Sequence, residues 1–371
     1  MPSQNLTPLR LLSALGQSVW IDNLSRESNR GGELQRLIDE DSVVGATSNP
    51  TIFQKAMTTG DAYEQQLRQL DPELAIKDVF WALAEDDIRD ACALFRPIFD
   101  GGGGRDGYVS LEVDPGLAYD TLATFREAIR LHESVDLPNL MVKIPATRPG
   151  LAAIEDVISK GRSINVTLIF SLERYEQVAE SYIRGLERLV AEGGHPASVA
   201  SVASFFVSRI DTEADKRLDE IGGEATGLKG KLAIANARLA YQSYKQIFSG
   251  ARWEYLQSKG ATPQRVLWAS TSVKDPDYRD TMYVEELAGA DTVNTMPEAT
   301  IRDFQDHGRP RPLLESDLVG ARDLLARLAA VGVDYEDVTD TCEREGVEKF
   351  ADSFAELLTA LEQKRSALVP A

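Results

Sequence analysis

The stretch PNLMVKIPAT (residues 138–147) places one lysine, Lys143, inside an otherwise apolar run. A continuous apolar run of this kind is typical of a strand that is buried on both faces of a parallel sheet. Burying a lysine amine is costly unless the amine is paired with an acid or gives up its charge. The run therefore predicts either an edge strand with a surface lysine or an interior strand whose amine takes part in chemistry.

Seven further strand-like runs lie along the chain, with amphipathic helical patterns between them. The eight runs are SVWID (18–22), VVGATS (43–48), YVSLEV (108–113), LMVKIP (140–145), INVTLIF (164–170), SVASFFVS (201–208), RVLWAS (265–270) and TVNTM (292–296). This alternation favours a parallel sheet. Eight runs in 371 residues predict an α/β fold, a (β/α)8 TIM barrel with helical insertions and a C-terminal helix, forming one domain over residues 1–371. A doubly wound sheet is the main alternative, but no GxGxxG follows an early strand.

Helical periodicity is clear between these runs. Residues 71–95 predict a helix with Asp71 as its N-cap and Pro72 in its first turn. The same pattern recurs in residues 118–134, 171–190 and 352–368. The segment 211–263 predicts a helical insertion and the helix before the seventh strand. The C-terminal helix is expected to cover either the barrel or a subunit contact.

The composition excludes several classes of function. A formal net charge of −19 and a pI of about 4.7 disfavour nucleic acid and anionic lipid as partners. No apolar run approaches the length of a membrane span, and the N-terminus does not read as a signal peptide. Two isolated cysteines, Cys92 and Cys342, fit a reducing cytoplasm. Three scattered histidines give no metal-binding spacing, so no metal site is expected.

Polar side chains recur on strand faces that would point into such a barrel. Alternate residues of a barrel strand face the interior, and catalytic groups lie near the C-terminal ends of the strands. The polar residues that fall on these faces or at these ends are Asp22, Thr47, Ser48, Asn49, Ser110, Glu112, Lys143, Asn165 and Thr167. Each residue alone is weak evidence for a site, but the convergence of polar residues from five strands predicts one shared cavity.

The residue types in this cavity indicate Schiff-base chemistry. A buried amine favours its uncharged form and can attack a ketone, and the protonated imine then withdraws electrons from a neighbouring C–C bond. Two carboxylates can move the protons, and Lys143, Glu112 and Asp22 supply this set. A phosphosugar-binding barrel without turnover and an aldolase that releases dihydroxyacetone to water are the alternatives. The roles of the two acids are interchangeable on these grounds.

Six motifs carry a resemblance to a known family. They are WIDNLSRE (20–27), GATSNPTIFQKAM (45–57), LEVDP (111–115), MVKIPAT (141–147), INVTLIFSLERY (164–175) and SFFVSRID (204–211). In this order they resemble the transaldolases, in the longer form found in many bacteria, and weaker similarity continues towards residue 300. The resemblance implies that Lys143 is the Schiff-base lysine on the fourth strand. It implies that Asp22 is the acid/base on the first strand and that Glu112 is its partner on the third.

The resemblance also implies roles for residues beside the lysine. Asn49, Asn165 and Thr167 resemble the residues that position the dihydroxyacetone moiety and the catalytic water, and Thr167 is therefore grouped with the catalytic residues. Ser110 shares its strand face with Glu112, and we predict that it contacts substrate as well.

A phosphate-binding end is implied by SFFVSRID. Ser204 and Arg209 resemble the phosphate-binding pair, and Phe206 is expected to line the site. Arg209 could instead pair with Asp211 and have no other role. The shorter form of the family has an arginine near the end of the seventh strand, where WASTSVKDP (268–276) offers Lys274. Lysine is a point charge without the bidentate fork of arginine, so this assignment differs from the family pattern.

The reaction implied by the resemblance belongs to the non-oxidative pentose phosphate pathway. Sedoheptulose 7-phosphate would give up a dihydroxyacetone unit to glyceraldehyde 3-phosphate, yielding erythrose 4-phosphate and fructose 6-phosphate. The imine is the electron sink, so the resemblance implies that no cofactor is needed. The expected partners are phosphorylated sugars, in the cytoplasm, and the sequence leaves open whether the protein is a monomer or a homodimer.

Overall fold

The computed structural model describes residues 6–368, and its strands form a closed parallel barrel. The strands are β1 (Gln17–Ile21), β2 (Val43–Thr47), β3 (Val109–Glu112), β4 (Leu140–Pro145), β5 (Ile164–Ile169), β6 (Ser201–Phe206), β7 (Arg265–Ala269) and β8 (Thr292–Met296). Each strand pairs with the next in chain order, and β8 pairs with β1. The predicted (β/α)8 barrel is confirmed, and each predicted run matches its strand to within two residues.

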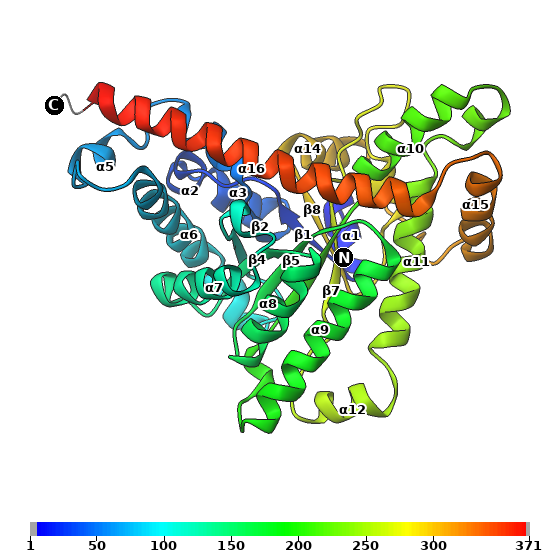
Figure 1. The fold of residues 1–371 in the computed structure, drawn as a ribbon, viewed down its shortest axis with the longest axis horizontal. Coiled ribbons are helices and arrows are strands. Elements are labelled where there is room, and N and C mark those ends of the chain that lie inside the picture. The colour runs from blue at the N-terminus through cyan, green and yellow to red at the C-terminus, as the bar shows by residue number, and fades with distance from the viewer. Residues whose placement is uncertain (1–5, 369–371) are drawn as a thin grey trace, which may run out of the picture.

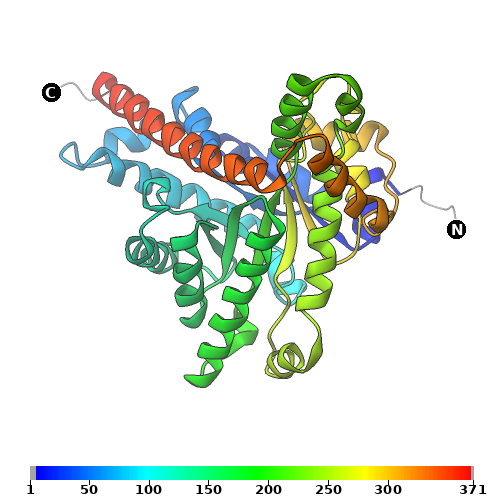
Figure 2. The same cartoon turned by 45° about the vertical axis from the view of Figure 1, so that its right-hand side comes forward.

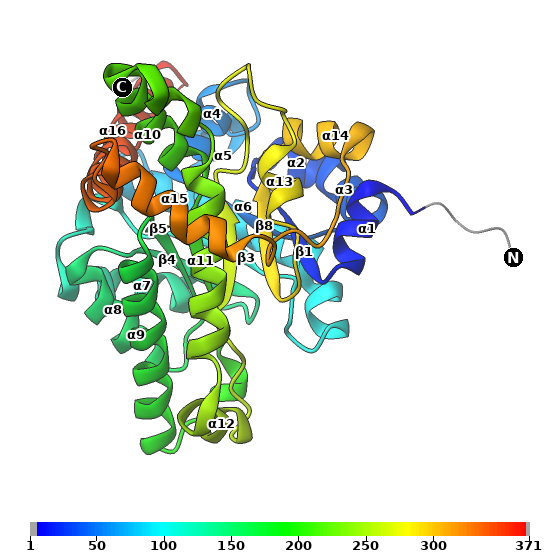
Figure 3. The same cartoon turned by 90° about the vertical axis from the view of Figure 1, so that its right-hand side faces the viewer.

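Helices surround the barrel, as Figures 1 and 3 show. They are α1 (Pro8–Ala14), α2 (Arg26–Gly31), α3 (Glu33–Glu40), α4 (Pro50–Thr58), α5 (Glu64–Gln69), α6 (Ile76–Gly101), α7 (Thr121–Val135), α8 (Arg148–Ser159), α9 (Leu172–Ala191), α10 (Ser208–Ile221), α11 (Leu232–Ile247), α12 (Gly250–Ser258), α13 (Met282–Glu286), α14 (Glu298–His307), α15 (Leu318–Ala330) and α16 (Tyr335–Leu368). None of the helices within residues 6–368 combines the length and the apolar character that crossing a membrane requires.

The start of α6 differs from the sequence-based prediction. The helix begins at Ile76, and Ala75 occupies the N-cap position without a side-chain hydrogen bond. The Asp71 carboxylate instead accepts a hydrogen bond of 2.9 Å from the backbone N–H of Glu73. This contact closes a local turn, in which aspartate side chains bond the backbone two residues on. The prediction of Asp71 and Pro72 as the start of the helix was therefore wrong.

Strand β4 lies inside the closed barrel, and this decides where Lys143 can be. Lys143 is in register with Glu112 of β3 on one side and with Asn165 of β5 on the other. A closed barrel has no edge strand. The alternative that Lys143 is a surface lysine on an edge strand was therefore wrong, and the residue as a whole is only 4% exposed.

Helix α16 runs across the end of the barrel at which the strands terminate (Figures 1 and 2). At its first residue, the Tyr335 hydroxyl donates a hydrogen bond of 2.7 Å to Asn236 of α11. Near its last residues, Lys364 donates to the carbonyl of Gly60 at 2.6 Å, and Arg365 donates to the carbonyl of Leu74 at 2.6 Å. Both ends of the helix are thus fixed to opposite sides of the barrel. Of the two predicted positions for this helix, the structure places it over the barrel.

Candidate active site

The amine of Lys143 is held at the C-terminal end of the barrel by two oxygens. Its Nζ donates a hydrogen bond of 2.9 Å to the carbonyl of Ser48, the residue after β2. The same nitrogen lies 3.1 Å from Oε2 of Glu112. The Ser48 hydroxyl in turn donates to the Ser110 carbonyl at 2.7 Å, which fixes the loop that presents the carbonyl. The amine therefore has a defined direction and a carboxylate in contact with it.

Both predicted acids lie in surroundings that favour their protonated form. Burial raises the pKa of Glu112 and of Asp22 above the ordinary values, and the nearby charge of Lys143 opposes the rise in both. Asp22 also accepts a hydrogen bond of 2.7 Å from the Thr47 hydroxyl. Carboxyl groups with raised pKa values are suited to giving and taking protons near neutral pH.

Thr295 of β8 is a residue of this region that the sequence analysis missed. Its hydroxyl lies 2.7 Å from the hydroxyl of Thr47, so it forms part of the network that reaches Asp22. It also lines the cavity beside Lys143. The TVNTM run was recognised as a strand, and the alternation of its residues was the signal that could have identified Thr295 as inward-facing.

A row of polar side chains lies beside the lysine on β3, β5 and β6. The Ser204 hydroxyl donates to Oδ1 of Asn165 at 2.6 Å, and Nδ2 of Asn165 donates to the Ser110 hydroxyl at 3.0 Å. Ser204 lines the cavity, whereas Ser110 and Asn165 are fully buried behind the cavity wall formed by the described residues. Direct contact of Ser110 and Asn165 with substrate stays a prediction. Their hydrogen bonds fix the orientation of Ser204.

Thr167 and Asn49 offer polar groups to the cavity. Among residues 6–368, the buried Thr167 hydroxyl has no hydrogen-bond partner, although it lines the cavity. A buried hydroxyl without a partner is costly and is free to bind a ligand or a water molecule. Asn49 caps α4 by accepting a hydrogen bond of 3.0 Å from the Ile52 N–H. Its amide N–H groups have no hydrogen-bond partner within the described part of the chain and can donate to a ligand.

The cavity around Lys143 has a volume of about 130 Å³. It collects eight of the eleven predicted site residues: Asp22, Asn49, Lys143, Thr167, Ser204, Phe206, Arg209 and Lys274. Of the other three, Glu112 contacts Lys143 directly, and Ser110 and Asn165 lie behind the wall. The structure therefore brings together side chains from strands β3 to β6, from the segments that follow β1 and β2, from the start of α10 and from the loop after β7.

Two cationic side chains, those of Arg209 and Lys274, line this cavity. Arg209 forms no ion pair within the described residues, and Asp211 instead accepts hydrogen bonds from the Ala233 N–H and the Tyr283 hydroxyl. The alternative of an Arg209–Asp211 pair was therefore wrong. Burial lowers the pKa of Arg209, yet a guanidinium remains charged in proteins. Burial and the charge of Arg209 also lower the pKa of Lys274. Two neighbouring cations with no acidic partner among residues 6–368 are suited to binding an anion.

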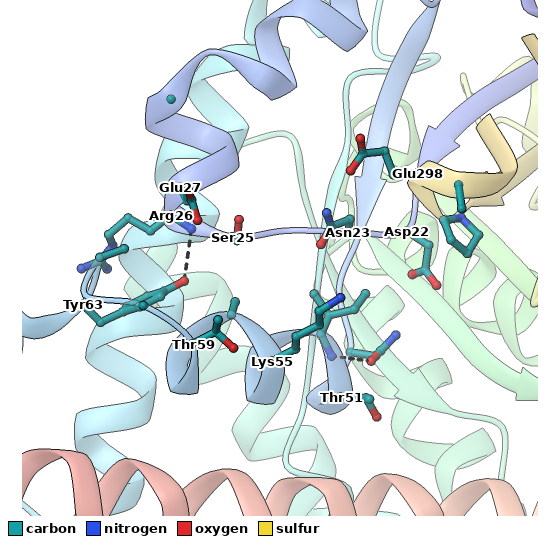
Figure 4. Close-up of a pocket in the computed structure, with 18 of the residues that line it drawn as sticks. Asp22, Asn23, Ser25, Arg26, Glu27, Thr51, Lys55, Thr59, Tyr63 and Glu298 are labelled. Carbon is teal, nitrogen blue, oxygen red and sulfur yellow. Dashed lines mark hydrogen bonds between the residues drawn. The ribbon is translucent and has the colours of Figure 1, made fainter. Parts of the chain in front are cut away.

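A second, larger cavity of about 1110 Å³ adjoins the first. Figure 4 shows it between α2, α4 and the segment around Tyr63, with Asp22 at the side nearest the barrel. The residues that line both cavities are Asp22, Asn49, Arg209, Pro297 and Phe350. The larger cavity therefore lies against Asp22 and Arg209 of the candidate site.

Comparisons with known proteins agree with this geometry. The family model described as transaldolase/fructose-6-phosphate aldolase matches residues 19–361. A protein of Acidothermus cellulolyticus named "Transaldolase" is 52% identical over 356 residues, covering 95% of this chain and 96% of the relative. A protein of Parafrankia sp. with the same name is 52% identical over 360 residues, covering 96% of this chain and 98% of the relative. "Transaldolase 2" of Streptomyces avermitilis is 48% identical over 365 residues, covering 98% of both chains. The chain therefore belongs to the transaldolase/fructose-6-phosphate aldolase family.

Proposed function

We propose that the protein is a transaldolase that transfers a dihydroxyacetone unit from sedoheptulose 7-phosphate to glyceraldehyde 3-phosphate. The observation that carries the proposal is a lysine amine, Lys143, buried at the C-terminal end of a barrel and in contact with Glu112. Neither a binding module nor a scaffold needs a buried amine in contact with an acid. The full-length relatives named transaldolase support the same reaction.

Imine formation is the first step that these residues can perform. A proton passes from the Lys143 ammonium to Glu112, and the free amine attacks the ketone carbon of the substrate. The resulting carbinolamine loses water to give the protonated imine, with Glu112 returning the proton to the departing hydroxyl. The unpartnered Thr167 hydroxyl can hold the water molecule that this exchange produces.

Cleavage of the C–C bond is the second step. Asp22 takes the proton from the C4 hydroxyl, the C3–C4 electron pair moves towards the imine nitrogen, and erythrose 4-phosphate leaves as an aldehyde. The three-carbon unit stays on Lys143 as an enamine. Its carbon then attacks the aldehyde of glyceraldehyde 3-phosphate while Asp22 returns the proton, and hydrolysis of the new imine releases fructose 6-phosphate.

Recognition of the phosphate group is assigned to Arg209, Lys274 and Ser204. All three line one cavity with Lys143, and the two cations supply local positive charge on an acidic protein. We place the reaction in the non-oxidative pentose phosphate pathway. We place the protein in the cytoplasm, which the two free buried thiols support.

Borohydride trapping tests the proposal. Borohydride added with fructose 6-phosphate should reduce the imine and leave a three-carbon adduct on Lys143, found by mass spectrometry of the peptide containing VKIPAT. The Lys143→Ala variant should give no adduct and almost no turnover while its circular dichroism spectrum is retained. Lys160→Ala removes an exposed lysine that pairs with Glu192 and is the matched control, which should be trapped like the wild type. An adduct on another lysine, or none, rejects the assignment.

The second candidate function is a fructose-6-phosphate aldolase, because the description of the matching family names both activities. Such an enzyme would release the three-carbon unit to water as free dihydroxyacetone. Product analysis with and without an aldose phosphate acceptor separates the two functions. A transaldolase turns over only when acceptor is present, whereas the aldolase forms dihydroxyacetone in its absence.

A further inference from the structure

Helix α16 brings a residue to the active site that lies on none of the barrel strands. Phe350, in the middle of this helix, is only 4% exposed and lines both the cavity around Lys143 and the larger cavity beside it. Because α16 is fixed at both ends, as described above, the position of Phe350 over the barrel is fixed as well. The ring is part of the cavity wall and not of the general core alone.

The ring of Phe350 faces the predicted phosphate-binding arginine. The guanidinium carbon of Arg209 lies 5.5 Å from the centroid of Phe350 and 5.1 Å from that of Phe206. The approach of α16 is close here because Gly346 has no side chain, and a Cβ at that position would come within 3.4 Å of Nη1 of Arg209. The arginine is therefore enclosed by α16 and by the end of β6.

Aromatic faces are the contacts that orient this guanidinium. In the chain from residue 6 to residue 368, the backbone carbonyl of Arg209 accepts a hydrogen bond from Cys342 Sγ, but its side chain forms neither an ion pair nor a hydrogen bond. Its five N–H donors are therefore available to a ligand. A guanidinium stacked on aromatic rings is held in place while its donors stay free. Such an arrangement is suited to bidentate binding of a phosphate group.

We propose that Phe350 is a positioning residue that holds Arg209 in the orientation required for the substrate phosphate. This inference rests on the proposed function, since it assigns a second residue to the same phosphate-binding end. Phe350 also lies 6.0 Å from Nζ of Lys143, so a separate effect on the lysine must be distinguished in the test.

Acceptors with and without phosphate make this distinction. Fructose 6-phosphate is the donor at saturating concentration, erythrose 4-phosphate or erythrose is the acceptor, and the release of glyceraldehyde 3-phosphate is followed. In Phe350→Leu, the KM for erythrose 4-phosphate should rise about tenfold, whereas the KM for erythrose should change less than about twofold. Phe350→Tyr keeps an aromatic face and should retain the wild-type ratio of the two KM values.

Phe354→Leu is the matched control, because Phe354 lies one turn further along α16 and packs against Phe80 and Trp81. Phe354→Leu should lose about as much thermal stability as Phe350→Leu but keep the wild-type KM values for erythrose 4-phosphate and for erythrose. In an Arg209→Gln background, the Phe350→Leu substitution should add no further increase in the KM for erythrose 4-phosphate.

Two results would overturn the inference while leaving the transaldolase function intact. An equal rise of KM for both acceptors would show that the Phe350 ring acts on Lys143 and not on Arg209. Additive effects of Phe350→Leu and Arg209→Gln on the KM for erythrose 4-phosphate would show that the two residues act independently. A wild-type protein that transfers no dihydroxyacetone at all would instead reject the proposed function itself.

Discussion

Oε2 of Glu112 lies 3.1 Å from Nζ of Lys143 across the β3–β4 pair, and both side chains are only 6% exposed. In the proposed mechanism, Glu112 is the group that exchanges a proton with the Lys143 amine. Exchange of the proton between these two groups leaves no net charge in the buried site. In the proposed mechanism, this contact couples activation of the amine to protonation of the acid that later serves dehydration.

Replacing this acid by its amide tests the coupling. Glu112→Gln keeps the size of the side chain but removes the proton acceptor, so the rate of imine formation should fall roughly 100-fold or more. The measurement is the rate at which borohydride-trappable adduct accumulates after mixing with fructose 6-phosphate. An unchanged rate would assign the proton transfer to another group. Melting temperature serves as the control for folding.

Thr167→Val removes the buried hydroxyl that has no partner among the described residues. Because the hydroxyl is unsatisfied in the absence of ligand, its loss should leave the free energy of unfolding unchanged or increase it by up to about 1 kcal/mol. Turnover should nevertheless fall about tenfold or more, since the hydroxyl is expected to hold the catalytic water. Steady-state kinetics and urea unfolding on the same samples check both parts. A stability loss with full activity would identify Thr167 as a structural residue.

Lys274→Met tests the cation in the loop after β7 that we propose as a phosphate-binding residue. The side chain is exposed, so the KM for erythrose 4-phosphate should rise only about threefold to fivefold, less than in Arg209→Gln. Added salt should raise the KM for erythrose 4-phosphate more in the wild type than in the variant, because salt screens exposed charges. Lys160→Met is the control and should leave the KM unchanged, because Lys160 is an exposed residue that lines neither cavity. A larger rise in KM in Lys274→Met than in Arg209→Gln would show that Lys274 contributes more than Arg209 to phosphate binding.

Asp211 of α10 predicts a specific dependence of stability on pH. Burial raises its pKa from 3.8 to about 7, and nearby Asp215 adds to the rise. Its contribution to stability is fully present below pH 3.8 and is lost as the pH rises towards 7, because the unfolded chain gives up its proton first. Relative to Asp211→Asn, the wild-type free energy of unfolding should fall by on the order of 2 kcal/mol between about pH 5 and about pH 8.

Urea unfolding of both proteins at the two pH values checks this expectation. The difference between the proteins is the quantity to compare, since groups that are common to both cancel. The same difference at both pH values would mean that Asp211 keeps an ordinary pKa in the folded protein.

The local pattern of apolar and polar residues was sufficient to predict the barrel and the side chains that face its interior. Each strand is a short apolar run between turn residues, and the period of two along LMVKIP and INVTLIF correctly places Lys143 and Thr167 at one cavity. Both are local properties, because a side chain's face follows from its position along its own strand. The motif resemblance then supplied roles that periodicity cannot assign.

Contacts between distant segments could not be predicted in this way. The Ser48 carbonyl that binds Lys143 carries no sequence signal, since every residue has a carbonyl. Phe350 reads as one more apolar residue of an amphipathic helix, and only the path of α16 over the barrel brings it to Arg209. The start of α6 was misplaced because an aspartate followed by proline is compatible with both a helix N-terminus and a turn.

The placement of α16 has a consequence for the synthesis of the protein. All eight strands have left the ribosome once Met296 has emerged, so a barrel with its lysine and acids can form while the chain is still growing. Phe350 adds its part of the cavity wall only later, because it follows Met296 in the chain and belongs to α16. Chains that stop between Met296 and Phe350 should thus hold a reactive amine in a site without this part of its wall, and should process sugar phosphates poorly.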